Sequence, residues 1–102
     1  MKKILLVCND GMSTGYLTNK MNEVVKERGL DCEVRAISEM TLDREWEESD
    51  CILLGPQIAY LKNNIIKRIN NARPVDSISP IDYGRINAQA VVDQALKMIN
   101  QK

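Results

Sequence analysis

The sequence predicts an α/β protein, a three-layer sandwich in which a four-stranded parallel sheet lies between two layers of helices. Two observations support this fold class. Short apolar segments alternate four times with segments of helical periodicity, an order typical of parallel sheets. The chain also has 102 residues, 44% of them hydrophobic, which suffices for the core of one domain. We therefore expect a single domain over residues 1–102.

Strand patterns occur in four segments. The first is a continuous apolar run, typical of a strand buried on both faces. The second alternates between apolar and charged residues, as a strand near a sheet edge does. The third ends at Gly55-Pro56, and the fourth follows Pro74. The predicted strands are residues 3–8, 32–37, 50–54 and 75–78.

Helix patterns follow the strands, with apolar residues three and four apart that give each helix one apolar face. The predicted helices are residues 15–28, 58–69 and 88–99. Gly29 is suited to end the first helix, and Asn70-Asn71 to end the second. We expect a short helix or turn at residues 42–48 and a loop at residues 79–84.

The order of the strands follows from their connections. Right-handed crossovers leave few arrangements of four parallel strands, and the flavodoxin-like order 2-1-3-4 is the natural one. In such sheets ligands bind beyond the carboxyl ends of the strands, where strands 1 and 3 lie side by side. Residues 8–15 and the turn Gly55-Pro56-Gln57 leave these two strands, so both belong to the predicted site.

The composition excludes several classes of protein. Lys+Arg and Asp+Glu balance at 14 each, so nothing suggests nucleic acid or an anionic membrane surface as a partner. No apolar run reaches the ~20 residues of a membrane-spanning helix, and we expect a cytoplasmic protein without direct membrane insertion. The three cysteines are widely spaced, so we expect reduced thiols, and the chain has no histidine. We therefore expect neither a bound metal nor a cofactor.

Cys8 is the candidate catalytic residue. It ends the first strand and precedes a Gly/Ser/Thr loop that leads into a helix. Amide groups of such a loop and the helix dipole favour negative charge, both on a phosphate and on the reactive thiolate. The alternative is structural: a cysteine can be a small buried hydrophobe, and Ser13 or Thr14 can simply cap the helix. Cys32 and Cys51 lie inside strand patterns, where the structural reading applies.

Three more residues are candidate neighbours of the site. Gln57 and Tyr60 follow the third strand, and Tyr83 follows the fourth, so all three lie toward the same edge of the predicted sheet. Each also has an ordinary reading, as part of a turn or as a helix residue with its side chain in water.

Two motifs together resemble a known family. Cys8-x-x-Gly11-Met12-Ser13-Thr14 follows the first strand, and Leu53-Leu54-Gly55-Pro56-Gln57-Ile58-Ala59-Tyr60 ends the third and continues beyond it. The pair resembles the enzyme IIB component of the lactose/cellobiose (N,N'-diacetylchitobiose) branch of the bacterial phosphoenolpyruvate-dependent sugar phosphotransferase system. The resemblance covers essentially the whole chain and would make residues 1–102 one phosphotransferase IIB domain.

The resemblance implies a phosphoryl relay. Cys8 would accept a phosphoryl group from a phosphohistidine on a IIA partner. It would pass the group to a sugar, a β-disaccharide such as cellobiose or chitobiose, on the membrane IIC partner at the inner face of the membrane. The loop that holds the phosphate would be Asn9, Asp10, Gly11, Met12, Ser13, Thr14 and Gly15. Asn9, Asp10 and Gly15 differ from the family's usual residues, and a carboxylate at Asp10 repels phosphate unless it points away.

Two other functions stay open at this point. Low-molecular-weight tyrosine phosphatases and arsenate reductases use a similar cysteine loop on a similar sheet, but Thr14 stands where their Cys-x5-Arg motif has arginine. The other alternative is a non-catalytic ligand-binding module. A receiver-like module would need an acidic residue where Leu54-Gly55 stand, and a flavin-binding one would need aromatic residues, of which the chain has few.

Overall fold

A computed structural model describes residues 1–9 and 12–100 of the chain and confirms the predicted fold class. The four strands form one sheet in the order β2-β1-β3-β4, and all neighbours pair in parallel. The α-helices are labelled α and the 3-10 helices η. The elements are β1 (Lys2–Cys8), α1 (Met12–Glu27), β2 (Cys32–Ser38), η1 (Glu39–Thr41), α2 (Leu42–Glu45), η2 (Trp46–Glu48), β3 (Cys51–Leu54), η3 (Pro56–Leu61), α3 (Lys62–Arg68), β4 (Val75–Ser77), α4 (Pro80–Gly84) and α5 (Ala88–Asn100).

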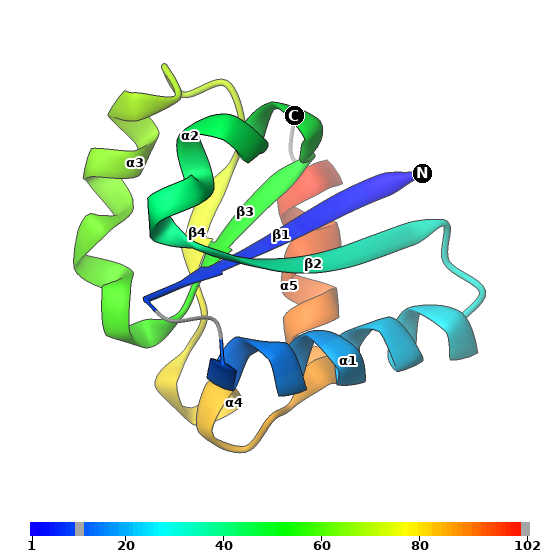
Figure 1. Cartoon of the computed structure of the whole chain (residues 1–102). Helices are drawn as coiled ribbons and strands as arrows, with labels where there is room; N and C mark the ends of the chain where they lie inside the picture. The colour runs from blue at the N-terminus through cyan, green and yellow to red at the C-terminus, as the bar shows by residue number, and fades with distance from the viewer. Residues whose placement is uncertain (10–11, 101–102) are drawn as a thin grey trace.

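Helices cover both faces of the sheet. The helices α1 and α5 lie on one face, whereas α2 and α3 lie on the other (Figure 1). β1 supplies both layers, because successive side chains of a strand point to opposite faces. Ile4 and Leu6 pack in the core with α1 and α5, and Leu5 and Val7 pack in the core with α2 and α3. This is the strand buried on both faces that the continuous apolar run predicts.

The predicted helix ends are found where the backbone turns left-handed. α1 ends at Glu27, and Gly29 has a φ of +65°, a conformation that costs glycine little. After α3, Asn70 and Asn71 both have positive φ values, of 54° and 55°. Asparagine tolerates this region better than most residues, so the pair ends the helix as expected.

Several element boundaries differ from the sequence prediction, above all at the starts of helices. α1 begins at Met12 instead of residue 15, so the second half of the predicted loop is its first turn. Residues 80–84, expected as part of a loop, form the short helix α4. The side chain of Ser79 accepts hydrogen bonds from the amides of Ile81 and Asp82, and Pro80 occupies the first turn, where its missing N–H costs nothing.

The predicted helix at residues 58–69 is also divided. It starts earlier, as η3, and regular α-helix begins only at Lys62. The backbone is non-helical at Ile58, with φ −121° and ψ 20°. The apolar spacing still serves its purpose, because Ile58, Ile65 and Ile69 are all buried in the same core.

Amide side chains from the helices bond to both outer strands of the sheet. The side chain of Asn22, on α1, donates to the carbonyl oxygen of Val34 in β2 and accepts from the amide of the same residue, both at 3.0 Å. The side chain of Gln94, on α5, donates to the carbonyl oxygen of Ser77 in β4 at 3.0 Å. These side chains satisfy main-chain N–H and C=O groups on the outer strands that could otherwise bond to an additional strand.

Candidate functional site

The carboxyl ends of β1 and β3 meet, as the strand order requires. Cys8 is the last residue of β1 and lies in register with Ser38, the last residue of β2. On the other side of β1, the amide of Gly55 donates to the carbonyl oxygen of Val7 at 2.9 Å. The segment after β3 is therefore fixed directly beside the end of β1.

Cys8 is buried and faces α1. Only 3% of the residue is exposed, and its sulfur lies 3.0 Å from the hydroxyl oxygen of Thr14, with either atom able to donate. Thr14 is itself 0% exposed. The sequence suggests Thr14 as a phosphate donor or a helix cap, whereas the structure directs this hydroxyl to the sulfur.

The first turn of α1 follows Cys8 closely in the chain. α1 has 16 residues, and the leading amide groups of a helix have no carbonyl partner within it. Together with the helix dipole they attract an anion at this end. Thr14 and Gly15 belong to this turn, and Met12 and Ser13 have helical backbone there. Asn9, also a predicted loop residue, is exposed, whereas Asp10 and Gly11 lie outside the described residues.

Gly55 lies against the cysteine, and a side chain at this position would meet Gln57 first. An added Cβ would lie 3.8 Å from the Cβ of Cys8, 3.6 Å from the carbonyl oxygen of Val7 and 2.9 Å from Oε1 of Gln57. The φ of Gly55 is −59°, a value that other residues adopt, so the backbone here does not require glycine.

The candidate neighbours differ in their exposure and in the residues that they contact. Gln57 directs its side-chain oxygen back toward Gly55, and through Gly55 it belongs to the surroundings of Cys8. Tyr60 is exposed to solvent on η3. Tyr83, on α4, is half-buried and packs against the core that contains α1 and α5.

Ser38 is a neighbour of the site that the sequence did not indicate. Its hydroxyl donates to the carbonyl oxygen of Asn9 at 3.4 Å and accepts from the amide of Met40 at 3.3 Å. The backbone just after Cys8 is thereby connected to η1. The pairing of the two strands could have indicated Ser38, because the last residue of the neighbouring parallel strand lies at the same edge as Cys8.

The other two thiols lie away from this edge, and they ionise less readily than an ordinary cysteine. Burial, with a contribution from Asp50, raises the pKa of Cys51 to about 12. Burial and the carboxylate of Asp31 also raise the pKa of Cys32. Among residues 1–9 and 12–100, no three His, Cys, Asp or Glu side chains are grouped so that they could hold a metal ion.

A comparison with family models decides the classification. Residues 3–94 match the model of the lactose/cellobiose-specific IIB subunit of the phosphotransferase system (PTS). The chain belongs to this IIB family. Thr14 stands where the phosphatase motif has arginine, and its hydroxyl lies 3.0 Å from the sulfur.

Related IIB components are known in several bacteria. The chain is 35% identical to the oligo-beta-mannoside-specific EIIB component of Bacillus subtilis, over 99% of this chain and 100% of the relative. It is 35% identical to the galactose-specific EIIB component of Lactococcus lactis subsp. cremoris and 34% identical to the cellobiose-specific one of L. lactis subsp. lactis. Both of these alignments cover 97% of each chain.

Solved structures agree with this assignment. The cellobiose-specific IIB component of Borrelia burgdorferi superposes with a TM-score of 0.84 at 31% identity, over 99% of this chain and 94% of that chain. The lactose-specific IIB domain of Streptococcus pneumoniae gives 0.85 at 14% identity, over 95% and 96% of the two chains, and supports the fold alone.

Membership in the family establishes a general role. IIB components are phosphotransferase components of sugar PTS and work with IIA and IIC partners. Within the described part of this IIB chain, none of the helices has the length and apolar character needed to cross a membrane.

Proposed function

We propose that this protein is a phosphoryl carrier in which Cys8 accepts a phosphoryl group from a phosphohistidine of a IIA partner. Cys8 then passes the group to a sugar bound by a membrane IIC partner, with the IIB protein in the cytoplasm and transiently at the inner face of the membrane. The position of Cys8 carries the proposal, because its sulfur lies at the carboxyl end of β1, beside the first turn of α1.

The first step is an in-line displacement at phosphorus. The Cys8 sulfur attacks, a sulfur–phosphorus bond forms, and the phosphorus–nitrogen bond of the donor histidine breaks. The electron pair of that bond stays on the imidazole nitrogen, which also receives the proton that the thiol gives up. In such transfers the enzyme mainly positions the groups and stabilises the charge on the three equatorial oxygens. The amides at the start of α1 are suited to this task.

The second step returns the cysteine to its starting state. A hydroxyl oxygen of the sugar attacks the phosphorus, the sulfur–phosphorus bond breaks, and the hydroxyl proton ends on the sulfur. The hydroxyl of Thr14, 3.0 Å from the sulfur, can donate to the thiolate as it forms or leaves. Thr14 therefore stabilises the cysteine in both steps.

The phosphate site is proposed to include backbone groups of Asn9 and of the loop that continues through Asp10 and Gly11 to Met12, Ser13, Thr14 and Gly15. Gln57 is proposed as a neighbour because its side chain reaches Gly55, next to Cys8. Tyr60 and Tyr83 are proposed to lie near the bound partner, on the elements that follow β3 and β4.

The substrate is proposed to be a β-linked disaccharide such as cellobiose or chitobiose. Relatives named for oligo-beta-mannoside and for cellobiose both handle β-linked sugars, and they are 35% and 34% identical to this chain. A third relative is named for galactose, so a galactoside such as lactose is the second choice.

Intact mass measurement tests the proposal. The protein is incubated with phosphoenolpyruvate, the general phosphotransferase proteins and the IIA protein of the same system. We expect one phosphoryl adduct, located on Cys8 and absent from the Cys8→Ser variant. The matched control is Cys32→Ser, which should still gain the adduct. An adduct that persists in Cys8→Ser, or no adduct on the wild type, contradicts the proposal.

A further inference from the structure

A hollow of about 300 Å³ lies between the second half of α1 and the start of α5. We call it the α1/α5 hollow. Its lining combines apolar and charged side chains, among them Val24, Ile86, Ala88, Lys20, Glu23 and Glu27. The described residues that line it do not include Cys8 or its proposed neighbours. The hollow is therefore a feature separate from the phosphoryl site.

Ile86, in the wall of the hollow, has an unfavourable backbone conformation. Its φ is +53°, a region in which a β-branched residue is an outlier. The amide of Ile86 donates to the carbonyl oxygen of Tyr83 at 3.2 Å, and the amide of Asn87 donates to that of Asp82 at 2.9 Å. This pair of bonds ends many helices, and the residue with positive φ is then usually glycine. A glycine in place of Ile86 would end α4 in the same way without the strain.

Packing within the chain offers Ile86 little in return for this strain. The residue is 38% exposed, and its side chain belongs to neither of the two cores. Strained backbone is typically found where a side chain serves a binding site. The strain therefore indicates that the apolar side chain of Ile86 is placed in the hollow for a partner to cover.

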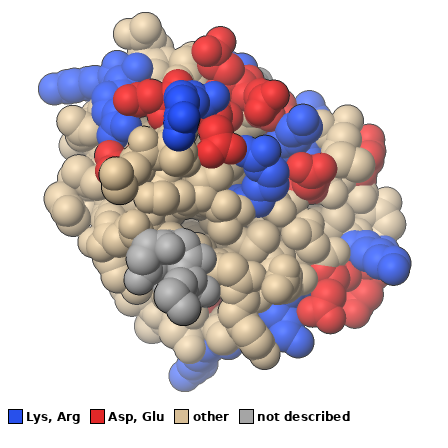
Figure 2. Space-filling model, in the orientation of Figure 1, with Lys and Arg blue, Asp and Glu red and all other residues tan. Residues whose placement is uncertain are grey.

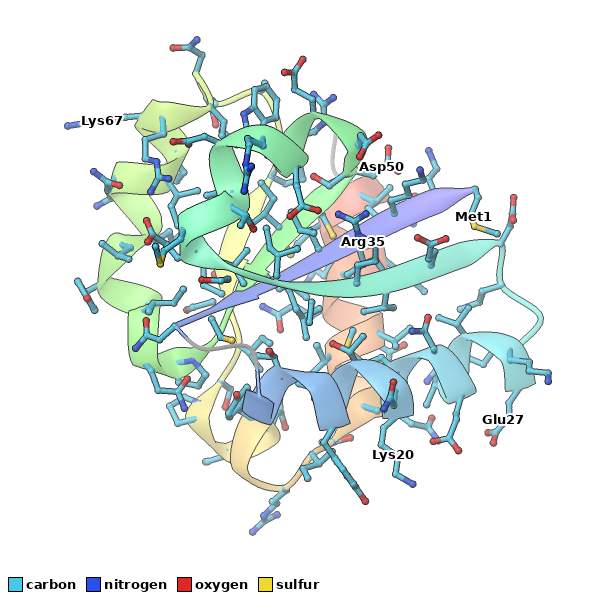
Figure 3. All side chains as sticks on the ribbon, viewed as in Figure 1. Met1, Lys20, Glu27, Arg35, Asp50 and Lys67 are labelled. Carbon is cyan, nitrogen blue, oxygen red and sulfur yellow. The ribbon has the colours of Figure 1, made fainter. Side chains whose placement is uncertain are left out.

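One carboxylate of the hollow is left without a cation. Figure 3 shows Lys20 and Glu27 projecting from α1 away from the sheet, and Figure 2 shows acidic side chains gathered at the lower right, over the end of α1. Lys20 is paired with Glu23 at 3.6 Å, and Arg28 is paired with Asp93 of α5 at 2.6 Å. Glu27 forms no ion pair with any residue that the structure describes. The hollow thus offers an apolar wall and one carboxylate to a cationic group.

We infer that the α1/α5 hollow binds an arginine or lysine side chain from a cytoplasmic loop of the membrane IIC partner. The aliphatic part of that side chain lies on Val24 and Ile86, and its charged end faces Glu27. The membrane partner is the protein that offers such side chains, because cytoplasmic loops of membrane proteins carry an excess of Lys and Arg. The inference rests on the proposed function, which makes a IIC protein the acceptor.

A contact at this place has a use in the relay. Because the hollow is separate from Cys8, the carrier can be held on IIC whether or not the sulfur carries a phosphoryl group. A second contact of this kind raises the local concentration of the carrier at the membrane partner without occupying the phosphoryl site. Binding of IIC should therefore be equal for the phosphorylated and the unphosphorylated protein to the extent that the hollow supplies it.

Binding of the membrane partner tests the inference. The probe is the purified IIC protein of the same system in nanodiscs of phosphatidylcholine, and the protein is used without phosphate. Ile86→Gly removes the side chain and also relieves the strain, so it should unfold at a higher urea concentration than the wild type. The same variant should nevertheless bind IIC at least about fivefold less tightly. A loss of binding in a more stable protein separates a role in recognition from a structural one.

A second variant tests the charge. Glu27→Gln should weaken binding by about threefold in 0.1 M NaCl, as expected for an exposed ion pair. The difference from the wild type should disappear near about 1 M NaCl, because salt screens the pair. The matched control is Glu48→Gln, the same change at an exposed position of η2, on the other face of the sheet. It should bind as the wild type does.

The opposite results are equally clear. Equal binding of IIC by the wild type and Ile86→Gly, or by the wild type and Glu27→Gln, overturns the inference, as does a wild type that does not bind IIC. Binding to nanodiscs without IIC that both variants lose would make a lipid the occupant. A wild-type dimer that both variants lose would make it a second copy of the chain. Either outcome also overturns the inference.

The phosphoryl step is measured separately. Both variants should accept phosphate from phosphorylated IIA at the rate of the wild type, because the hollow does not include Cys8. Slower transfer in both variants would assign the hollow to the donor and overturn the inference. If the wild type gains no phosphate at all, the proposed function fails, while the binding of IIC still decides the role of the hollow.

Discussion

The sulfur of Cys8 and the hydroxyl oxygen of Thr14 lie 3.0 Å apart, across the connection between β1 and α1. Both residues are buried, so this contact is shielded from water. A hydrogen bond to a charged group is stronger than one between neutral groups, and more so in a buried place. The contact therefore matters most when the sulfur is a thiolate, which is the state that attacks and leaves phosphorus in the proposed transfer.

Thr14→Val removes the hydroxyl but keeps the shape of the side chain. Transfer to Cys8 should slow by about tenfold to a hundredfold, since a hydrogen bond to a charged group contributes about 1.5–3 kcal/mol. Thr14→Ser keeps the hydroxyl and should recover most of the rate. Rapid-quench measurement of phosphocysteine formation checks this, and equal rates for the valine and serine variants would show that the hydroxyl has no part in the step.

Gly55→Ala should disturb the site without unfolding the protein. The backbone of Gly55 accommodates alanine, but the new Cβ would lie 2.9 Å from Oε1 of Gln57, whose side chain must move. If Gln57 assists transfer, the rate should fall in Gly55→Ala by as much as in Gln57→Ala. The double variant should then be no slower than Gln57→Ala. Additive losses would instead place the effect of Gly55 at Cys8 itself.

Gly15→Ala should stabilise the protein while keeping the backbone amide that belongs to the proposed phosphate site. Apart from its chain neighbours and the backbone of its own helix, no described atom lies within 4 Å of a Cβ built at Gly15, in the first turn of α1. Alanine in place of a helical glycine typically adds about 0.5–1 kcal/mol of stability. Urea unfolding measures this gain, and phosphorylation kinetics serve as the second readout. A loss of transfer at full stability would mean that the phosphate needs the open backbone of this glycine.

Asn22→Ala should destabilise the outer strand β2. The variant loses two hydrogen bonds to the main chain of Val34 and should be less stable by about 1–3 kcal/mol. Asn19→Ala is the matched control, because it makes the same change on the exposed face of the same helix. Similar unfolding free energies for the two variants would contradict the role assigned to Asn22.

Cys51 should give the protein a specific sensitivity to alkali. Burial raises its pKa from 9.0 to about 12, so the folded state keeps a thiol proton that the unfolded state loses above about pH 9. This contribution to stability is complete below pH 9 and is lost as the pH rises toward 12, by at most about 1.4 kcal/mol per pH unit. Urea unfolding between about pH 8 and about pH 10.5 should show a steeper decline for the wild type than for Cys51→Ala. Equal declines in the wild type and in Cys51→Ala would contradict this role of Cys51.

The sequence predicted the sheet well because its strands depend on simple patterns. β1 and β3 are buried on both faces, so their apolar runs have few other interpretations. The connections were harder to predict. Ser79-Pro80 was interpreted as part of a loop, although the same two residues are a helix start when the hydroxyl accepts from the amides that follow. Whether these residues form a loop or begin a helix depends on the neighbouring structure, which a local sequence pattern does not reveal.

The candidate site was predicted by topology more than by motif. Strand order alone places Gly55 beside the end of β1, and the structure packs it on Cys8. The orientation of Thr14 could not be predicted, because it depends on where α1 begins and which way its first turn faces. Ser38 was missed for a similar reason, since only the register of β2 against β1 brings it next to Cys8.

The amide side chains on the outer strands have a consequence for how the protein behaves when concentrated. An open strand edge invites another sheet to continue it, and growth of that kind ends in fibres. Asn22 fills such a position on β2, and Gln94 fills one on β4. Edges that are filled in this way resist permanent pairing with another chain. Loss of Asn22 would thus be felt first as precipitation during storage or overproduction.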